Sequence, residues 1–302
     1  MLIFIMVKEN KFSNTLKHIL LKGNHVAFKK RSTRPCDNMY TPVQIPTYLH
    51  DTFSEYINYY ETELPSFDAW VICMWHFHQV KPIPKGHSVT NIIVADACID
   101  CIVDQENQTI FLSGLSTMYH DVITEHPGDS FGIRMRPGAA HALFGIHATE
   151  AMDKPFDVTD RLVDSSFWNL SVQEQEGVLT TNLETLSIKI TSHQALEWFE
   201  VLFNDLYLSS VDTISAHFGY SSKHMNRLFL QYYGMNVKAV VMVIRMQKAL
   251  SHLINDPSEA LTTLALEMGY YDQSHFINDL KLNLGMTPYA VLKRLEDVHF
   301  FQ

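Results

Sequence analysis

The sequence has little cysteine, no long apolar run and none of the common catalytic motifs. Four cysteines in 302 residues are too few for a disulfide framework. No apolar run approaches the roughly 18 residues that span a bilayer, so no membrane partner is expected. A Gly-rich phosphate loop, a Gly-x-Ser-x-Gly elbow and a His-Glu-x-x-His pair are all missing. We therefore expect no enzyme activity and no cofactor.

The first 38 residues differ in composition from the rest of the chain. Residues 1–36 carry eight Lys or Arg and one Glu, including Lys29, Lys30 and Arg31. The apolar stretch at residues 1–7 lacks the basic flank and cleavage site of a secretory signal, so a cytoplasmic location is expected. We interpret residues 1–38 as a disordered tail or a mis-assigned start upstream of Met39. A basic arm that contacts phosphates is the alternative.

Charge is distributed unevenly along the chain, whose formal net charge is −10. Residues 37–204 hold seven Lys or Arg against 23 Asp or Glu, whereas residues 205–302 hold eight against nine. The acidity therefore lies in the middle of the chain. A basic face is the usual mark of nucleic-acid binding. Any nucleic-acid binding by the nearly neutral C-terminal segment must therefore depend on where its few cations lie.

Hydrophobic patterning predicts an α+β chain. Between residues 65 and 164, short β-rich runs alternate with turn residues, as at residues 69–75, 89–94 and 109–112. This spacing fits a β-sandwich or a barrel. Helical periodicity occurs at residues 52–61 and from 171 to 208. One apolar helix face in the second stretch consists of Ala195, Trp198, Phe199, Leu202 and Phe203.

Cysteine and histidine spacings in the β-rich region raise two alternatives. Cys98 and Cys101 are spaced as in redox or metal pairs, but residues 94–103 read as a strand, on which side chains three apart point to opposite faces. We therefore expect structural thiols.

His76 and His78 share one strand face, a spacing that metal sites use. A metal-dependent enzyme of barrel fold is thus the rival class, although no further ligand follows at a persuasive distance.

A motif occurs twice within the last hundred residues, at an offset of about 50 residues. Each copy has a small residue that lets two helices approach, a glycine for a tight turn, a helix N-cap and a closing glycine. Helix, tight turn and capped second helix together make a helix-turn-helix unit. The four positions are Ser215, Gly219, Ser221 and Gly234 in the first copy, and Ala265, Gly269, Asp272 and Gly285 in the second.

Apolar spacing supports the same two units. Met225 and Phe229 in the first copy match Phe276 and Leu280 in the second, at positions that face inward on a helix. Residues 237–253 form an apolar-patterned stretch between the copies, which we expect to be a helix that sets their separation. After the second copy, residues 287 and 288 read as a helix cap followed by proline at the first helical position.

The duplicated segment resembles the DNA-binding domain of the AraC/XylS family of bacterial transcription regulators over residues 207–295. The most specific matches are residues 269–276, residues 285–288 and the stretch 238–250 that contains Arg245. The resemblance implies a sequence-specific, one-component transcription regulator on the nucleoid. It implies double-stranded DNA as a partner, with RNA polymerase, a small-molecule effector and a second copy of the chain as further partners.

The resemblance also implies which residues meet DNA. Asn278 and Leu280 depart from the family, which often has Arg and Phe there, so the second unit is expected to bind less strongly. Arg and Lys can bond guanine edges, and Gln or Asn can pair with adenine. The expected base-facing residues are Ser222, Lys223, Asn226, Arg227, Gln273, Ser274 and Asn278, with His275 and Lys281 nearer the backbone.

Residues 134–145 resemble a motif in the poorly defined N-terminal domains of some AraC-type regulators, which bind an effector or dimerise. Arg134, Arg136 and His141 are the expected effector-binding residues, with the two arginines as a clamp for an anion. We expect a β-rich sensing or dimerisation domain over 39–165, connecting helices over 166–206 and the DNA-binding domain over 207–302. An interaction protein with a degenerate DNA-binding domain is the remaining alternative, because the C-terminal charge is so low.

Overall fold

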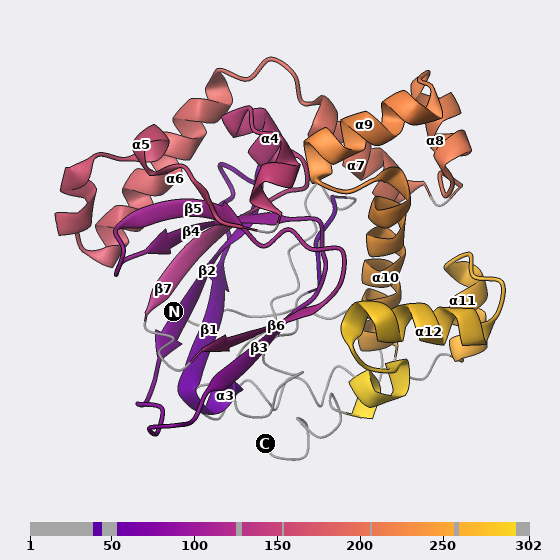
Figure 1. Cartoon of the computed structure of the whole chain (residues 1–302), viewed down its shortest axis with the longest axis horizontal. Coiled ribbons are helices and arrows are strands. Elements are labelled where there is room, and N and C mark those ends of the chain that lie inside the picture. Colours follow the sequence, from indigo (N-terminus) through magenta and orange to yellow (C-terminus); the bar gives the residue numbers. More distant parts are fainter. Residues whose placement is uncertain are drawn as a thin grey trace.

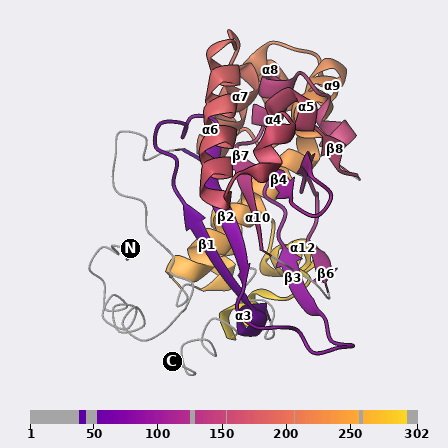
Figure 2. The same ribbon diagram turned by 90° about the vertical axis from the view of Figure 1, so that its left-hand side faces the viewer.

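The computed structural model of the chain describes residues 39–43, 53–124, 129–152, 154–205, 207–256 and 260–293. Figures 1 and 2 show an antiparallel sheet with helices packed beside it and a second group of helices on the far side of the molecule. The basic segment 1–38 lies outside the described residues, so both interpretations of it stay predictions. None of the described helices is both long and apolar enough to span a bilayer.

The sheet has six strands in the spatial order β1-β2-β7-β4-β5-β8, and neighbouring strands pair antiparallel. A separate two-stranded sheet pairs β3 with β6. Strands predicted near residues 69–75, 89–94 and 109–112 are present with shifted ends. The bounds are β1 (Ile57–Thr62), β2 (Val71–Gln79), β3 (Val89–Ile93), β4 (Ile99–Asp104), β5 (Thr109–Ser113), β6 (His120–Thr124), β7 (Ser130–Met135) and β8 (Phe156–Asp157).

The helix predicted over residues 52–61 is wrong for most of its length. Only α3 (Phe53–Tyr56) is helical, and β1 follows it directly. Ile57 and Tyr59 are buried in alternation, and every residue of β1 pairs with β2. Tertiary pairing along a whole strand outweighs the local helical period, and the aromatic residues of this segment suit a strand.

The strand expected over residues 94–103 begins only at Ile99, because Ala97 has a positive φ of 60° that ends regular extension. Cys98 and Cys101 are both buried and neither forms a disulfide. Burial raises the pKa of both thiols well above the usual range, which keeps them protonated. Inert buried thiols of this kind agree with a structural role.

Short helices follow the sheet, and two longer ones lead to the C-terminal region. The predicted helical stretch 171–208 is interrupted after Ile188 and continues at Gln194. Ser171 and Glu174 form a capping box at the start of the first of these two helices. The elements are α4 (Ala139–Phe144), η1 (Ala148–Ala151), α5 (Thr159–Leu162), η2 (Ser165–Asn169), α6 (Val172–Ile188) and α7 (Gln194–Asn204).

The C-terminal region is helical throughout its described length, which confirms the α+β class with an all-α C-terminal part. One hydrophobic cluster runs from the sheet into these helices and includes Leu115, Phe199 and Phe229. The two parts of the chain therefore share a core. The helices are α8 (Val211–Phe218), α9 (Ser222–Tyr233), α10 (Val237–Asn255), α11 (Leu261–Glu267) and α12 (Gln273–Leu284), and a further helix begins at Pro288.

Candidate nucleic-acid interface

The first unit consists of α8, a tight turn and α9. Gly219 ends α8 in the left-handed region at φ 75°, where a residue with a Cβ is strained. The Ser221 side chain then accepts a hydrogen bond from the backbone N–H of His224 and caps α9. Ser215, the small residue expected to let the two helices approach, is buried.

The second unit repeats this arrangement with α11 and α12. Gly269 has a φ of 77°, and Ala265 is fully buried. The Asp272 carboxylate accepts a 2.8 Å hydrogen bond from the His275 N–H and caps α12. Two helix-turn-helix units in one chain are therefore present where the repeat predicts them.

The inward faces of α9 and α12 are apolar and buried. Met225 and Phe229 on α9, like Phe276 and Leu280 on α12, have exposed fractions of 0–1%. The opposite faces carry polar side chains, because a helix that packs along one apolar stripe leaves the other side to solvent. Each unit thus presents the outer face of its second helix.

The helix α10 joins the two units. Its 19 residues make it about 28 Å long, close to the roughly 34 Å of one DNA turn. Figure 1 shows α9 and α12 near opposite ends of α10, with α8 and α11 on the side away from the sheet. The two second helices are therefore held apart by one continuous helix, as residues 237–253 predict.

In the first unit, two of the four expected contact residues carry exposed charges. Lys223 and Arg227 are exposed, and the Arg227 Nη2 lies 3.3 Å from the His224 Nδ1. The Ser222 hydroxyl donates to Asp212 at 3.1 Å. Asn226 is half-buried: its amide donates to the Ser222 carbonyl, and its oxygen accepts the Val237 N–H that starts α10.

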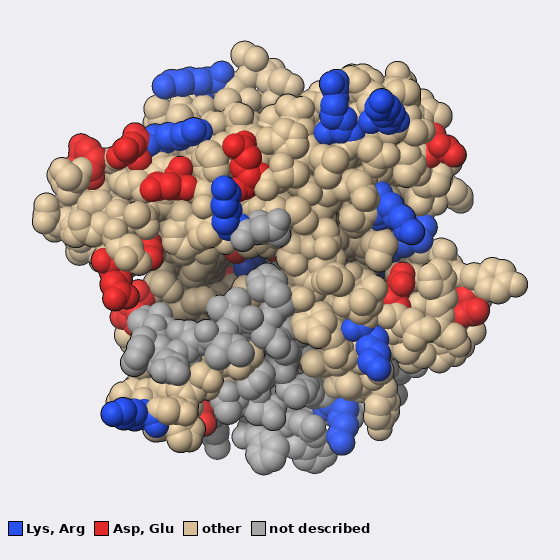
Figure 3. Space-filling model, viewed as in Figure 1, with Lys and Arg blue, Asp and Glu red and all other residues tan. Residues whose placement is uncertain are grey.

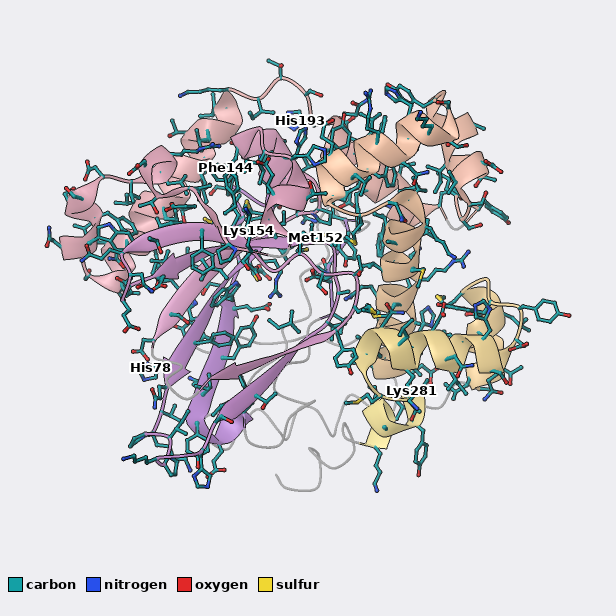
Figure 4. The ribbon with its side chains drawn as sticks, viewed as in Figure 1. His78, Phe144, Met152, Lys154, His193 and Lys281 are labelled. Carbon is teal, nitrogen blue, oxygen red and sulfur yellow. The ribbon has the colours of Figure 1, made fainter. Side chains whose placement is uncertain are left out.

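In the second unit, Ser274, Asn278 and Lys281 are exposed on α12. Gln273 accepts a 2.8 Å hydrogen bond from the Thr262 hydroxyl, which ties it to α11. The His275 Nε2 lies 3.9 Å from the Asp279 carboxylate. Figure 4 shows Lys281 near the end of α12 that lies toward the sheet, remote from the helix start.

The electrostatics of the two units differ. The segment 211–233 has Lys223 and Arg227 against Asp212, whereas 261–284 has Lys281 against three carboxylates. Figure 3 shows Lys and Arg side chains spread over the C-terminal helices, with Asp and Glu gathered over α5 and α6. A polyanion is therefore attracted more strongly by the first unit.

Two relations among these side chains were not predicted from the sequence. The Tyr220 ring stacks on His224 at 4.9 Å, and His224 in turn faces Arg227, so the turn orients the guanidinium. On the second helix, the Asp279 carboxylate lies 3.9 Å from the His275 ring. An exposed His and an Asp four residues apart, at i and i+4, are the sequence signal for the second relation.

Residues 214–294 match the model of a helix-turn-helix domain. This region is an AraC-type DNA-binding domain. The protein that carries it is a DNA-binding transcription regulator. The sheet-bearing part, residues 64–157, matches a domain of unknown function, DUF6597, which names no ligand for this regulator.

Solved structures of ToxT from Vibrio cholerae are similar to the regulator at low identity. One ToxT structure is 10% identical with a TM-score of 0.37, and the alignment covers 68% of this chain and 89% of that chain. Another, of wild-type ToxT bound to an unsaturated fatty acid, is 11% identical with a TM-score of 0.35 and covers 78% and 94%. No curated sequence matches the regulator.

The two arginines expected to clamp an effector are engaged inside the regulator. Arg134 is buried, and its Nε lies 3.2 Å from Asp100 and 3.8 Å from Asp96. Burial raises the pKa of the Asp100 carboxyl, while Arg134 and a hydrogen bond from Trp75 oppose that shift. The surrounding charge is therefore acidic, which is unfavourable for an anion.

Arg136 and His141 join parts of the fold. Arg136 donates to the carbonyls of Tyr40 at 2.7 Å and Asp68 at 2.6 Å and lies 3.5 Å from Glu200 of α7. The His141 Nδ1 lies 2.6 Å from the Ile146 carbonyl, and its Nε2 faces Gln231 of α9 at 3.4 Å. Arg136 thus joins the sheet-bearing part to α7, and His141 contributes to its contact with the C-terminal helices.

The histidine pair behind the metal-enzyme alternative is divided between different partners. His76 pairs with Glu176 of α6 at 2.9 Å and stacks on Tyr60. His78 pairs with Asp129 at 3.0 Å, and Figure 4 shows it on the sheet, far from Lys281. Within the described ranges, no three His, Cys, Asp or Glu side chains are grouped to hold a metal ion.

Proposed function

We propose that α9 and α12 lie in successive major grooves of one DNA duplex. The observation that carries the proposal is the exposure of the outer faces and capped starts of both helices, which lie near opposite ends of the 19-residue helix α10. Free backbone N–H groups at the helix starts favour phosphate contact, and side chains in the first turns reach base edges.

Within the first unit, Lys223 and Arg227 supply the main contacts, and Ser222 adds a hydroxyl near the helix start. Asn226 acts chiefly at the joint between α9 and α10, because both ends of its amide are bonded there. In the second unit, Ser274 and Asn278 face the bases, Gln273 and His275 flank them, and Lys281 contacts the backbone. The first unit dominates affinity since it holds the excess of positive charge.

Fluorescence anisotropy tests this assignment. The probe is a labelled duplex of about 30 base pairs, selected by the regulator from a randomised library. Binding should weaken as salt rises, because phosphate contacts release counterions. Affinity that does not change with salt, or selection that recovers no preferred sequence, would contradict the proposal.

Replacement of Asn278 by arginine is expected to strengthen DNA binding about three- to tenfold, since it adds a cation to an exposed position of the weaker unit. The slope of log affinity against log salt should steepen by about one. Asn278→Gln, which adds length without charge, is the matched control. If both variants bind like the wild type, α12 does not approach the duplex at this position.

Substitution of Cys98 by serine is expected to leave DNA affinity unchanged. The thiol is buried in the sheet-bearing part, outside both helix-turn-helix units, and the backbone N–H of Cys98, not its sulfur, bonds to Asp96. A buried hydroxyl without a partner lowers the free energy of unfolding by about 1–3 kcal/mol. Denaturant melts and anisotropy titrations of the same preparation measure both quantities. A changed affinity at unchanged stability would point to a functional thiol.

Control by an effector is part of the proposal. The sheet-bearing part contacts the C-terminal helices, so a ligand that prefers one arrangement changes DNA affinity or contact with RNA polymerase. His141 is the best placed of the three predicted effector residues, because it faces Gln231 on the recognition helix α9. A second copy of the chain, bound through the sheet-bearing part, is the alternative source of control.

A further inference from the structure

The loop between β5 and β6, residues 114–119, leaves the sheet and reaches the C-terminal helices. Gly114 starts the loop at φ 100°, a conformation that favours glycine. Leu115 is buried and belongs to the same core as the helices. The loop is therefore packed against the DNA-binding region, although its ends belong to the sheets.

Tyr119 at the end of this loop lies against the end of α12. Its backbone N–H donates a 3.1 Å hydrogen bond to the Asn283 carbonyl in the last turn. A Cβ on Gly285, the glycine that ends α12, would lie 2.5 Å from the Tyr119 Cζ. The ring thus occupies the space that any side chain at position 285 would need.

Leu115 makes the corresponding contact with the end of α9. A Cβ on Gly234 would overlap the Leu115 Cδ2 and come within 3.4 Å of the Ala148 backbone in η1. Gly234 and Gly285 hold the same position in the two copies of the repeat. One short loop therefore contacts equivalent points at the ends of both second helices.

The turn glycines of the two units have no such neighbours. A Cβ on Gly219 would meet nothing within 4 Å, and on Gly269 only Arg245, at 3.7 Å. Both have nearly the same φ as the closing glycines. The four glycines share a backbone requirement, but only the closing pair provides a surface for the loop.

The two units differ in their other contacts with the rest of the fold. Tyr233 of α9 donates to the Ala195 carbonyl, and Trp198 stacks on Phe218 at 4.4 Å, so α7 fixes the first unit independently. Gln247 of α10 donates to the Ala95 carbonyl at 2.9 Å. The last turn of α12 is joined to the sheet-bearing part by the hydrogen bond from the Tyr119 N–H to the Asn283 carbonyl.

We propose that Leu115 and Tyr119 are positioning residues for DNA recognition. By holding the ends of α9 and α12, the loop sets the distance and angle between their capped starts, and so the spacing of the two DNA half-sites that the regulator accepts. This rests on the two-groove contact proposed above. One inserted base pair shifts the second half-site by about 3.4 Å and rotates it about the helix axis. A second unit whose position is fixed by the loop cannot move to reach the shifted half-site.

Hydrogen exchange of the free regulator tests the holding role without DNA. Tyr119→Ala should speed exchange in α11 and α12 and leave α8 and α9 unchanged, because opening free energies are local. Met118→Ala, an exposed neighbour in the same loop, is the matched control, and Tyr119→Phe should behave as the wild type. Equal exchange in Tyr119→Ala and Met118→Ala would overturn the proposal.

A spacing series tests the effect on recognition. In anisotropy titrations with the library-selected duplex, one or two inserted base pairs between the half-sites should weaken wild-type binding about tenfold, since the second contact is lost. For Tyr119→Ala the same insertion should lower DNA affinity about twofold or less. The affinity of this variant for a duplex with only the first half-site should equal that of the wild type. The same tenfold penalty in Tyr119→Ala, or tighter binding of the original duplex, would overturn the positioning role.

The two experiments separate the possible failures. If insertion leaves wild-type affinity unchanged, the two-groove contact itself is wrong, and the positioning role falls with it. If insertion weakens wild-type binding but the Tyr119→Ala exchange and spacing results equal those of Met118→Ala, the two-groove contact stands and the loop does not position the helices.

Discussion

Replacement of Arg227 by alanine is expected to weaken binding to the library-selected duplex about 10- to 100-fold, because a bidentate contact with guanine contributes roughly 1–3 kcal/mol. Arg227 is exposed on the outer face of α9, and His224 and Tyr220 orient it from the turn. Discrimination against substituted bases should fall at one position of the first half-site, since the loss concerns a base edge rather than a phosphate.

Lys189→Ala is the matched control for Arg227→Ala. It also removes one positive charge, but from an exposed position just after α6, outside both units. Its affinity should stay within about twofold of the wild type, because long-range charge effects are screened at physiological salt. Equal affinities for Arg227→Ala and the wild type in anisotropy titrations would contradict the assignment of α9.

Replacement of Arg134 by methionine is expected to lower the free energy of unfolding by about 3–5 kcal/mol, the usual cost of removing one partner from a buried ion pair. Arg134 lies between Asp100 and Asp96, both largely inaccessible to solvent, with Glu61 3.8 Å away. Methionine keeps the apolar stem but leaves the carboxylates without their cation. Denaturant unfolding of the two proteins measures the difference.

The destabilisation should depend on pH in a defined direction. Burial already raises the pKa of Asp100 in the folded state above its value in the unfolded chain. The free energy of unfolding therefore falls as pH rises from the usual Asp range through that raised pKa. Without Arg134 this pKa rises further. The stability deficit of Arg134→Met should therefore be largest near neutral pH and shrink on acidification, whereas a deficit independent of pH would contradict the charge explanation.

An exposed ion pair provides the control for Arg134. Lys81 lies 2.6 Å from Glu55, and both side chains are about half exposed. Lys81→Met should lower the free energy of unfolding by at most about 1 kcal/mol, as surface pairs do. If Arg134→Met also lowers the free energy of unfolding by less than about 1 kcal/mol, Arg134 is not required for packing. Such a result would favour the anion clamp predicted from the sequence.

The C-terminal helical part of the fold could be predicted because its signals are local. Turn glycines, N-caps and an apolar stripe at helical spacing each act within a few residues, and here they agree with one another at both copies of the repeat. Ser221 and Asp272 cap their helices as expected. The outward-facing residues follow from the same periodicity, since whatever is not on the buried stripe faces solvent.

The sheet-bearing part was predicted less completely because its structure depends on distant partners. β1 reads as a helix until β2 is present to pair with it. The two arginines of the motif at residues 134–145 look like an anion clamp until Asp100 and Tyr40 are brought beside them. Pairings separated by tens of residues leave no periodic mark on the sequence.

The closing glycines show where local reasoning is incomplete. Gly234 and Gly285 were predicted as helix ends, and both have the expected positive φ. Their contact with the loop at 114–119 depends on a strand connection more than a hundred residues away. A residue chosen for its backbone conformation thereby also serves as a docking surface.

Methylation protection of guanine N7 on the selected duplex tests the central claim most directly, because N7 lies in the major groove. Two protected clusters about 10 base pairs apart on one face of the duplex are expected, and Arg227→Ala should remove protection in one of them. A single cluster, or two clusters on opposite faces, would contradict the placement of α9 and α12 in successive grooves.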